Sequence, residues 1–519
     1  MPKRQTTYSK PCAPRRAGSG RAEGFSLAIA SRARRHDTGL GGARLLLAGI
    51  VLVALGVRFW HLTSSSLWVD EGFSVQVAVL DRARAMELIM ADTHPPLYYL
   101  ALLAWTSVFG AGEFALRSLS VLFGVLTIPV LFSIGRMLVG LRVGLLAAAL
   151  LATSALHVQY STEVRMYSLL PLLASVALWG AVRFATAPEE RGARLKGAFV
   201  FVLGSTLALW TQMAGLFVIP SASLIMLVGW WLGGRGRAAG LTWLLANVVL
   251  LGILAASVPV LSVLMANAKG LVAWLPPPTP RVIAETIGPM LAQKLNAILS
   301  VRLTTVAAAG FALVAALGLW AARRNPRFLA FAILAGVLPF VLTIAVSFAV
   351  APIFVTRIHL WSLLPLYLLI AAAMVAYGGR VAGFVLVGFV MAAQAAGLYA
   401  YHAEWSRPDW RSAVALIAAS AGPGDVIVTP PPPGVDAVIG YYAAPLRRLV
   451  RPVGEKEQLP DLVAAAEGKR VWAVSSPWHD RVEPAALAEA LGRGHRADAA
   501  VSFPLVTVQL WHPPRAERR

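Results

Sequence analysis

The stretch "LLLAGIVLVALGVRFWHLTSSSLWVDEGFS", residues 45–74, decides the fold of this chain. Its first part belongs to an apolar run, 44–62, that is long enough to cross the ~30 Å core of a bilayer as a helix. Two adjacent carboxylates, Asp70 and Glu71, follow shortly after that run. The stretch therefore predicts a membrane protein with paired anions at the membrane surface.

The composition of the whole chain supports this interpretation. Of 519 residues, 58% are hydrophobic and 14% are charged, whereas ordinary soluble domains are roughly 45–50% apolar and about 25% charged. The excess of apolar residues comes in blocks of membrane-spanning length rather than spread along the chain. We therefore expect a polytopic α-helical membrane protein.

The apolar blocks predict the spans. After 44–62 they lie at 96–111, 114–136, 139–157, 168–184, 197–213, 215–233, 239–264, 303–321, 328–350, 359–377 and 382–400. The run 96–111 is short and opens at Pro95-Pro96, so we expect that it does not cross by itself. This gives about eleven crossings.

Basic residues between the runs predict the orientation. They are Arg191, Arg194, Lys196, Arg235, Arg237, Arg323, Arg324, Arg327 and Arg380. Cytoplasmic loops accumulate Lys and Arg, so these breaks and the N-terminus should lie inside. The outside then receives Asp70, the segments 157–167 and 351–358, a short helix near 81–91, an amphipathic segment at 281–298 and everything after 401.

The basic N-terminal segment 1–43 is rich in Arg, Ser and Gly and lacks apolar periodicity, which predicts a disordered cytoplasmic tail near anionic lipid. The net charge of +21 would suggest nucleic acid in a soluble protein. Here the positive-inside bias explains it, so no nucleic-acid partner is expected. Cys12 is the one cysteine, which excludes a disulfide within the chain.

The C-terminal segment 401–519 differs from the rest. Residues 424–430 and 469–477 have the pattern of short buried strands, while 410–420 and 483–494 have helical spacing. Alternating strands and helices predict a small extracytoplasmic α/β domain. The expected domains are therefore the tail 1–43, a transmembrane part 44–400 and an α/β domain 401–519.

Three polar clusters abut the spans: Asp70-Glu71, "DTHPPLYY" (92–99) and "HVQYSTEVRMYSLLP" (157–171). A carboxylate against an apolar wall is poorly hydrated and can serve as a base. Arg165 could hold a phosphate with its guanidinium group. Neighbouring carboxylates such as Asp70 and Glu163 could also hold a divalent cation, Mg²⁺ or Mn²⁺. Taken singly, each cluster could equally be a solvated loop, a surface ion pair or a belt of interfacial aromatics.

The order of the motifs is more specific than any one of them. "LWVDEGFS" is followed by "THPPLYYLALLAWTSVFGAGEFALRSLSVLFGVLTIPVLFSIGR" (93–136), "YSTEVRMYSLL" (160–170), "RIHLWSLLPLYLLIAA" (357–372) and "RPDWRSAVALI" (407–417). This series resembles the polyprenyl-phosphate-sugar glycosyltransferases of the GT-C fold, in particular the family-39 protein mannosyltransferases and the bacterial aminoarabinose-transferase-like group. The resemblance implies a bacterial inner-membrane enzyme that uses a polyprenyl-phosphate-linked sugar.

The resemblance also implies roles for individual residues. The acidic pair would be catalytic, with Glu163 completing it. The substrate-binding residues would be His94, Arg165, Tyr167, Arg357 and His359. The mannosyltransferases follow His-Pro-Pro with Leu-Gly-Lys, whereas Leu97-Tyr98-Tyr99 follows here. This departure favours the broader bacterial group, whose acceptors include lipids and glycans, over a protein acceptor.

Two other classes remain open from the sequence. A transporter of lipid-linked sugars would place its ionisable groups inside the spans, whereas here they gather at the outer ends. A receptor or scaffold displaying 401–519 would leave Asp70, His94, Glu163 and Arg357 far apart. The separation of these four residues in space is therefore the deciding measurement.

Overall fold

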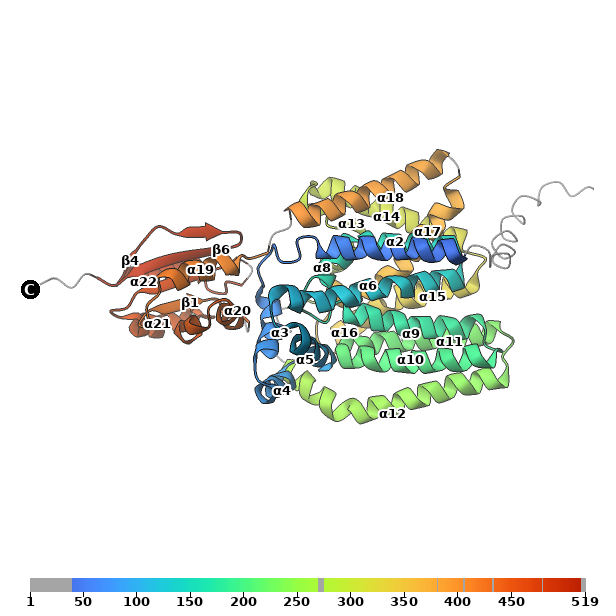
Figure 1. Cartoon of the computed structure of the whole chain (residues 1–519), viewed down its shortest axis with the longest axis horizontal. Coiled ribbons are helices and arrows are strands. Elements are labelled where there is room, and N and C mark those ends of the chain that lie inside the picture. Colours follow the sequence, from blue (N-terminus) through green and yellow to red (C-terminus); the bar gives the residue numbers. More distant parts are fainter. Residues whose placement is uncertain are drawn as a thin grey trace, which may run out of the picture.

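The computed structural model describes residues 40–268, 275–379, 381–404, 407–431, 434–477 and 479–514. Within them, ten helices are long and apolar enough to cross a membrane, or eleven if one bent pair counts as a span. These helices form one bundle, and a small α/β domain lies at one end of it (Figure 1). The predicted fold class is confirmed. Most of the predicted tail, 1–39, and the predicted inside marker Arg380 lie outside the described residues.

The bundle contains α2 (Leu40–Phe59), α6 (Glu113–Leu138), α7 (Leu141–Thr153), α8 (Ala155–Ser161), α9 (Leu169–Thr186), α10 (Arg191–Thr211), α11 (Val218–Leu232), α12 (Arg237–Ala268), α14 (Val301–Ala321), α15 (Pro326–Gly336), α16 (Leu338–Ala349), α17 (Leu363–Tyr377) and α18 (Val381–Tyr399). Short turns adjoin some of them: η1 (Met213–Phe217), η2 (Leu295–Ala297), η3 (Thr356–Ser362) and η4 (Ala400–Glu404). Each predicted apolar run from 114 onward coincides with one or two of these helices.

Four shorter helices lie between the spans: α3 (Val69–Val79), α4 (Arg82–Ala91), α5 (Leu97–Phe109) and α13 (Pro280–Ala292). With its 13 residues, α5 is about 20 Å long at the usual rise of an α-helix. It is therefore too short to cross a bilayer core, as expected for the run 96–111. Figure 1 shows α3, α4 and α5 at the end of the bundle that faces the α/β domain.

The opposite end of the bundle carries the basic loops. Asn325 donates a hydrogen bond to the carbonyl of Leu138 at 2.8 Å, and the Nε of Arg327 donates to the carbonyl of Ala185 at 2.9 Å. The loops after α6, α9 and α14 therefore meet there, away from α3. This grouping is what a positive cytoplasmic face requires.

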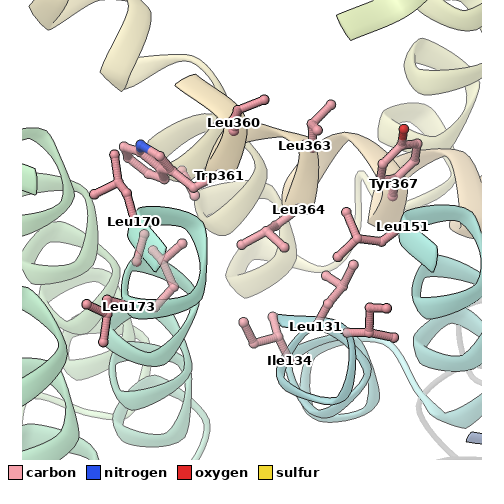
Figure 2. Close-up of a cluster of buried hydrophobic side chains, with 14 of the residues drawn as sticks. Leu131, Ile134, Leu151, Leu170, Leu173, Leu360, Trp361, Leu363, Leu364 and Tyr367 are labelled. Carbon is pink, nitrogen blue, oxygen red and sulfur yellow. The ribbon is translucent and has the colours of Figure 1, made fainter. Parts of the chain in front are cut away.

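Close helix packing holds the bundle together. Leu131, Ile134, Leu151, Leu170, Leu173, Trp361, Leu363, Leu364 and Tyr367 meet in a buried cluster where η3 and α17 cross α6, α7 and α9 (Figure 2). Between α9 and α10, a Cβ on Gly180 would lie 2.5 Å from the backbone nitrogen of Phe201. Small residues at such contacts let two backbones approach, because van der Waals packing drives helix association in lipid.

A sharp break of 61° separates α7 from α8. The side chain of Ser154 accepts from the backbone N–H of His157 and so caps α8. The buried guanidinium group of Arg58, from α2, donates to the carbonyl of Ala152 at 2.9 Å and to Nδ1 of His157 at 2.9 Å. The arginine therefore satisfies backbone oxygens that the break leaves open.

The C-terminal domain is an α/β sheet. Its strands are β1 (Val426–Thr429), β2 (Val450–Pro452), β3 (Val471–Ser475), β4 (Arg496–Ala497), β5 (Val501–Phe503) and β6 (Val506–His512), in the order β2-β1-β3-β6-β4, with β5 paired to β6. Strands β2, β1 and β3 are parallel, and β6 is antiparallel to β3. The helices α19 (Trp410–Ser420), α20 (Val435–Tyr442), α21 (Leu459–Ala466) and α22 (Pro484–Gly492) cover it.

Polar contacts fix this domain on the bundle. Ser66 donates to the carbonyl of Pro408 at 2.7 Å, and Arg411 pairs with Glu113 at 2.6 Å. Gly434, in the left-handed region with φ 121°, lies directly against Gly72 of α3, where a Cβ would come within 2.5 Å of the Gly434 carbonyl oxygen. The domain therefore sits on the first turn of α3, which carries Asp70 and Glu71.

Candidate active site

Asp70 is the accessible member of the acidic pair. It lies in the first turn of α3, where a negative charge is favoured by the helix dipole. Its side chain is 33% exposed, and its Oδ2 lies 3.4 Å from Nη1 of Arg357, which is 31% exposed. Arg357 belongs to η3, 287 residues away in the chain. The fold thus brings the first and a late polar segment into contact.

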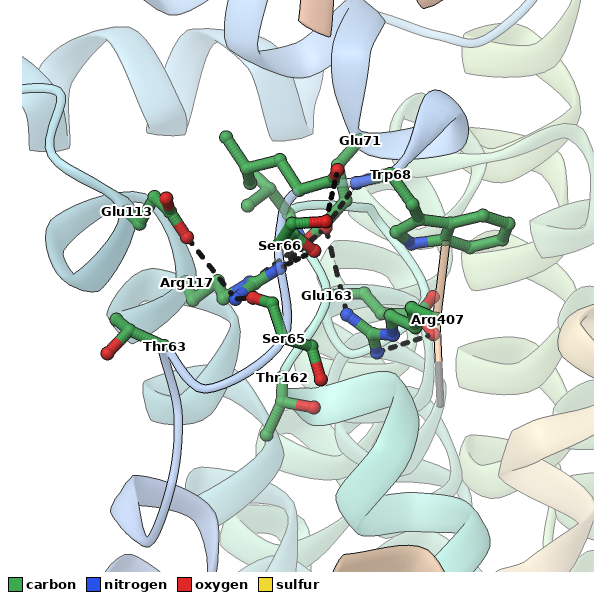
Figure 3. Close-up of polar contacts among 12 residues, drawn as sticks. Thr63, Ser65, Ser66, Trp68, Glu71, Glu113, Arg117, Thr162, Glu163 and Arg407 are labelled. Atoms are coloured by element: carbon green, nitrogen blue, oxygen red, sulfur yellow. Dashed lines mark hydrogen bonds and ion pairs between the residues drawn. The ribbon is translucent and has the colours of Figure 1, made fainter. Parts of the chain in front are cut away.

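Glu71 points the other way and is fully buried. Arg117 of α6 binds both of its oxygens, at 3.1 and 2.9 Å, and the backbone N–H of Val164 donates to Oε1 at 2.9 Å (Figure 3). Burial alone would raise the pKa of Glu71, but Arg117 and then Arg407 more than offset it, so the pKa is lowered. Glu71 is therefore an ionised anchor between three separate segments.

Arg117 also organises the chain before α3. Its Nη1 donates to the carbonyls of Leu62 at 2.9 Å and Ser65 at 2.8 Å, and its Nη2 donates to Ser66 at 3.0 Å. The contacts with Leu62 and Ser66 are buried, and the contact with Ser65 is partly buried. The ion pair with Glu71 therefore sets the position at which α3 begins, and with it the position of Asp70.

Glu163, the third predicted acid, is also buried. Its Oε1 accepts from Nη2 of Arg407 at 3.2 Å and from the amide of Gln159 at 3.3 Å. Burial raises the pKa of Glu163, and Arg407 only partly offsets this. Arg407 also lies 3.7 Å from Glu71, so one guanidinium group joins the two buried carboxylates (Figure 3).

A cationic wall adjoins Asp70. The guanidinium groups of Arg165 and Arg357 lie 5.7 and 5.6 Å from the ring centroid of Tyr167, which supports both by cation–π contacts. Nη1 of Arg165 donates to the hydroxyl of Tyr99 at 3.3 Å, and that hydroxyl donates to Asp92 at 2.7 Å. Two arginines beside one partly exposed carboxylate form a place suited to a phosphate next to a base.

The two predicted histidines differ. Nδ1 of His94 lies 3.3 Å from Asp92, whose other contacts link it to Tyr99 and so to Arg165. Burial lowers the pKa of His94, and the bond to Asp92 only partly opposes this. His359 instead shares hydrogen bonds with Thr343 at 2.8 Å and the Val355 carbonyl at 3.0 Å. The structure therefore joins His94 to the cluster but does not bring His359 into it.

The sequence motifs do not single out every participant. Arg117 lies within the apolar run 114–136, and a charge inside a membrane-length segment is itself a signal of function or pairing. Arg407 opens the C-terminal motif, which gives no sign of its buried partners. Asp92 and Tyr99 lie within "DTHPPLYY", where the pattern alone predicts no role for them. No sequence pattern shows that Arg407 meets Glu71 and Glu163, because those contacts span 244 residues or more.

The residues predicted as metal ligands do not fit that role well. Asp70 faces Arg357, and Glu163 faces Arg407. Within the described residues, no group of three or more His, Cys, Asp or Glu side chains could hold an ion. A divalent cation at this site stays a prediction.

The fold is that of an integral membrane protein of the GT-C type. Two crystal structures of ArnT from Cupriavidus metallidurans are similar to it. The apo form shares 16% identity with a TM-score of 0.59, covering 91% of this chain and 98% of that one. The form bound to undecaprenyl phosphate shares 15% identity with a TM-score of 0.56, covering 90% and 98%.

Sequence comparison is more local. Residues 93–263 match the family described as dolichyl-phosphate-mannose-protein mannosyltransferase. No curated protein matches the chain. The family match therefore supports the resemblance inferred from the motifs over residues 93–263. The GT-C fold that this resemblance implied is confirmed by the two solved structures.

Proposed function

We propose that this protein is a membrane glycosyltransferase that moves a sugar from a polyprenyl-phosphate donor to an acceptor hydroxyl on the extracytoplasmic face. The observation that carries the proposal is the contact between Asp70 and Arg357, with Arg165 and Tyr167 beside them. The scaffold interpretation required Asp70 and Arg357 to lie far apart, and they are in contact. A partly exposed carboxylate next to two arginines fits acid–base and phosphate chemistry at one place.

The donor phosphate would bind to Arg165 and Arg357. Guanidinium groups match the geometry of phosphate oxygens and stay charged at all relevant pH values. Tyr167 keeps the two side chains together through its ring. The lipid tail would lie among the helices of the bundle, and the similarity to an ArnT structure that holds undecaprenyl phosphate supports this.

Sugar transfer would proceed with inversion. Asp70 takes the proton of the acceptor hydroxyl as that oxygen attacks C1 of the sugar. The bond from C1 to the phosphate oxygen breaks, and polyprenyl phosphate leaves with the electron pair. Arg165 and Arg357 stabilise the negative charge that develops on it. Asp70 then releases its proton to solvent. The transferred sugar would be a hexose or a pentose.

Glu71 and Glu163 would act by positioning. Glu71 anchors the start of α3 through Arg117, and Glu163 holds the segment that carries Arg165 through its contact with Arg407. Neither carboxylate is exposed. We propose that they keep Asp70 and Arg165 at a fixed separation, which is what proximity catalysis requires.

The orientation follows from charge. With the basic loops inside, the N-terminus lies in the cytoplasm and the C-terminal domain outside. Eleven crossings, an odd number, place the two ends of the chain on opposite sides. We propose the bacterial inner membrane as the location. The acceptor would be a lipid or glycan reached from that outer surface, with a protein as the less favoured choice.

The proposed function is tested by measuring sugar transfer by the purified protein. Purified protein is incubated with undecaprenyl-phosphate sugars and a membrane fraction from cells that lack it, and mass spectrometry follows free undecaprenyl phosphate and labelled acceptor. We expect both to appear with wild type and neither with Asp70→Asn. A transporter would instead move the lipid between the leaflets of liposomes, unchanged by that substitution. Such a result would replace the proposal.

A further inference from the structure

The C-terminal domain presents one particular edge of its sheet to the bundle. After β1 the chain returns at Gly434, which lies against Gly72 of α3. Because β3 is parallel to β1, with Ile427 opposite Trp472, the segment that follows β3 leaves the sheet at the same edge. Ligands of open parallel sheets bind outside the carboxyl ends of the strands. Here that edge faces the helix turn that carries Asp70.

A tight turn follows β3 at this edge. The backbone N–H groups of His479 and Asp480 donate to the carbonyl of Ser476 at 2.8 and 2.9 Å, and Asp480 accepts from the Ser476 N–H at 2.9 Å. The hydroxyl of Ser476 shares a hydrogen bond of 3.1 Å with Nδ1 of His479. The imidazole is thus held by one nitrogen. Its Nε2 has no hydrogen-bond partner among the described residues.

The imidazole lies toward the Asp70 side of the domain. Its ring centroid is 6.3 Å from that of Trp410, which is fully buried. The backbone N–H of Trp410 donates to Ser66, four residues before Asp70, at 3.1 Å. Burial lowers the pKa of His479, and the nearby Asp70 carboxylate only partly raises it. His479 is therefore a neutral imidazole whose Nε2 can accept or donate one hydrogen bond.

Polar contacts hold the C-terminal domain in a fixed position on the bundle. Ser66 binds Pro408, Arg411 binds Glu113, and the backbone N–H of Leu67 donates to Tyr442 at 2.7 Å. The distance between the imidazole and Asp70 is thus set by the docking of the domain, as a substrate-positioning group requires.

We propose that His479 is an acceptor-contacting residue, whose Nε2 holds a hydroxyl of the acceptor head group in reach of Asp70. The inference rests on the proposed function and adds the acceptor side of the site. Asp70 remains the base, and His479 transfers no proton. Ser476 fixes the ring through Nδ1. The ligand class is a hydroxyl-rich head group of a membrane-bound acceptor.

The experiment compares His479→Ala, His479→Gln and the control His512→Ala. His512 is exposed, pairs with Asp498, and lies at the opposite edge of the sheet, because β6 is antiparallel to β3. Three quantities are measured with undecaprenyl-phosphate sugar: affinity for undecaprenyl phosphate, hydrolysis of the donor by water, and transfer to membranes from cells lacking the protein. Transfer is followed as the amount of membrane is raised.

Loss of one hydrogen bond should raise the half-saturating amount of membrane about tenfold in His479→Ala. Hydrolysis and phosphate affinity should not change. His479→Gln, which keeps a hydrogen-bonding group, should recover part of the loss, and His512→Ala should match wild type. Unchanged transfer in His479→Ala, or an equal fall in all three quantities, would overturn the assignment. Wild-type protein that neither hydrolyses nor transfers would overturn the proposed function itself.

Discussion

Two groups of charges lie side by side at the end of the bundle that carries the C-terminal domain, and they are built differently. In the buried network of Glu71, Arg117, Arg407 and Glu163, the carboxylates are closed off from solvent and the arginines contact them directly. In the cluster of Asp70, Arg357, Arg165 and Tyr167, here called the open cluster, the ion pair between Asp70 and Arg357 is long and about one-third exposed. Arg165 and Tyr167 lie buried behind that pair. The same residue types thus hold structure in one place and remain available to a ligand in the other.

The neighbours Asp70 and Glu71 show the difference most clearly. They occupy consecutive positions of α3 and therefore point in different directions, about 100° apart on a helix. One ends in the open cluster and the other in the buried network. An exposed pair with a long separation contributes little to stability, whereas breaking a buried pair is costly. Substitutions should therefore separate activity from stability.

The largest effect is expected on activity. Asp70→Asn removes the proposed base and should lower kcat about 10²–10⁴-fold, with the thermal unfolding temperature in detergent unchanged. The exposed helix cap Asp81→Asn serves as the control. The measurement is release of undecaprenyl phosphate. An Asp70→Asn protein that turns over like wild type would remove Asp70 from the chemistry.

Glu71→Gln should weaken the buried network and lower the stability of the protein. It leaves the buried Arg117 with its main partner neutralised, which costs about 3–5 kcal/mol of folding free energy. Thermal unfolding in detergent measures this, and Glu285→Gln, in an exposed pair with Arg281, should change nothing. Full stability combined with loss of turnover would show that Glu71 belongs to the chemistry instead.

Arg357→Gln should weaken the donor site. A charge-assisted hydrogen bond is worth about 1.5–3 kcal/mol, so the KM for the donor should rise about ten- to a hundredfold. Arg357→Lys should recover part of the binding, and the exposed Arg302→Gln should resemble wild type. If kcat fell and KM did not change, Arg357 would act in the transition state alone.

The raised pKa of Glu163 predicts that the stability of the protein depends on pH. Burial raises the pKa of Glu163 in the folded protein. The protonated carboxyl therefore adds to the free energy of unfolding at pH values below the pKa of the unfolded chain. This contribution is lost as the pH rises through the pKa of the folded protein. Glu163→Gln mimics the protonated acid. The variant should therefore gain in unfolding temperature relative to wild type as pH rises from 4.5 to 8. A constant difference over that range would contradict the raised pKa.

The smallest effect is expected from chelation. A metal that stabilised the departing phosphate would supply several kcal/mol, but the two predicted ligands each face an arginine. Treatment with EDTA should therefore change turnover by less than about twofold. A larger fall, restored by Mg²⁺ or Mn²⁺, would show that a cation binds to Asp70 and displaces Arg357.

Much of the fold follows from the sequence because membrane spans are local. A run such as 239–264 satisfies its own backbone as a helix whatever its neighbours do, and the short apolar runs in 424–430 and 469–477 already indicate buried strands. The site is less local. The acidic pair, Glu163 and Arg357 could be named from motif order, but the partition of Asp70 and Glu71 into two groups could not. It depends on Arg117 and Arg407, whose contacts come from distant parts of the chain.

The break between α7 and α8 has a consequence for how the chain is made. Arg58 lies in the first helix, yet its partners Leu151, Ala152 and His157 are synthesised about a hundred residues later. Until they arrive, this guanidinium group must stay near the lipid head groups, because an unpaired charge is expensive in hydrocarbon. The first helix can therefore take its final depth only when α7 and α8 have been inserted, so the N-terminal half of the bundle should assemble as one unit during biosynthesis.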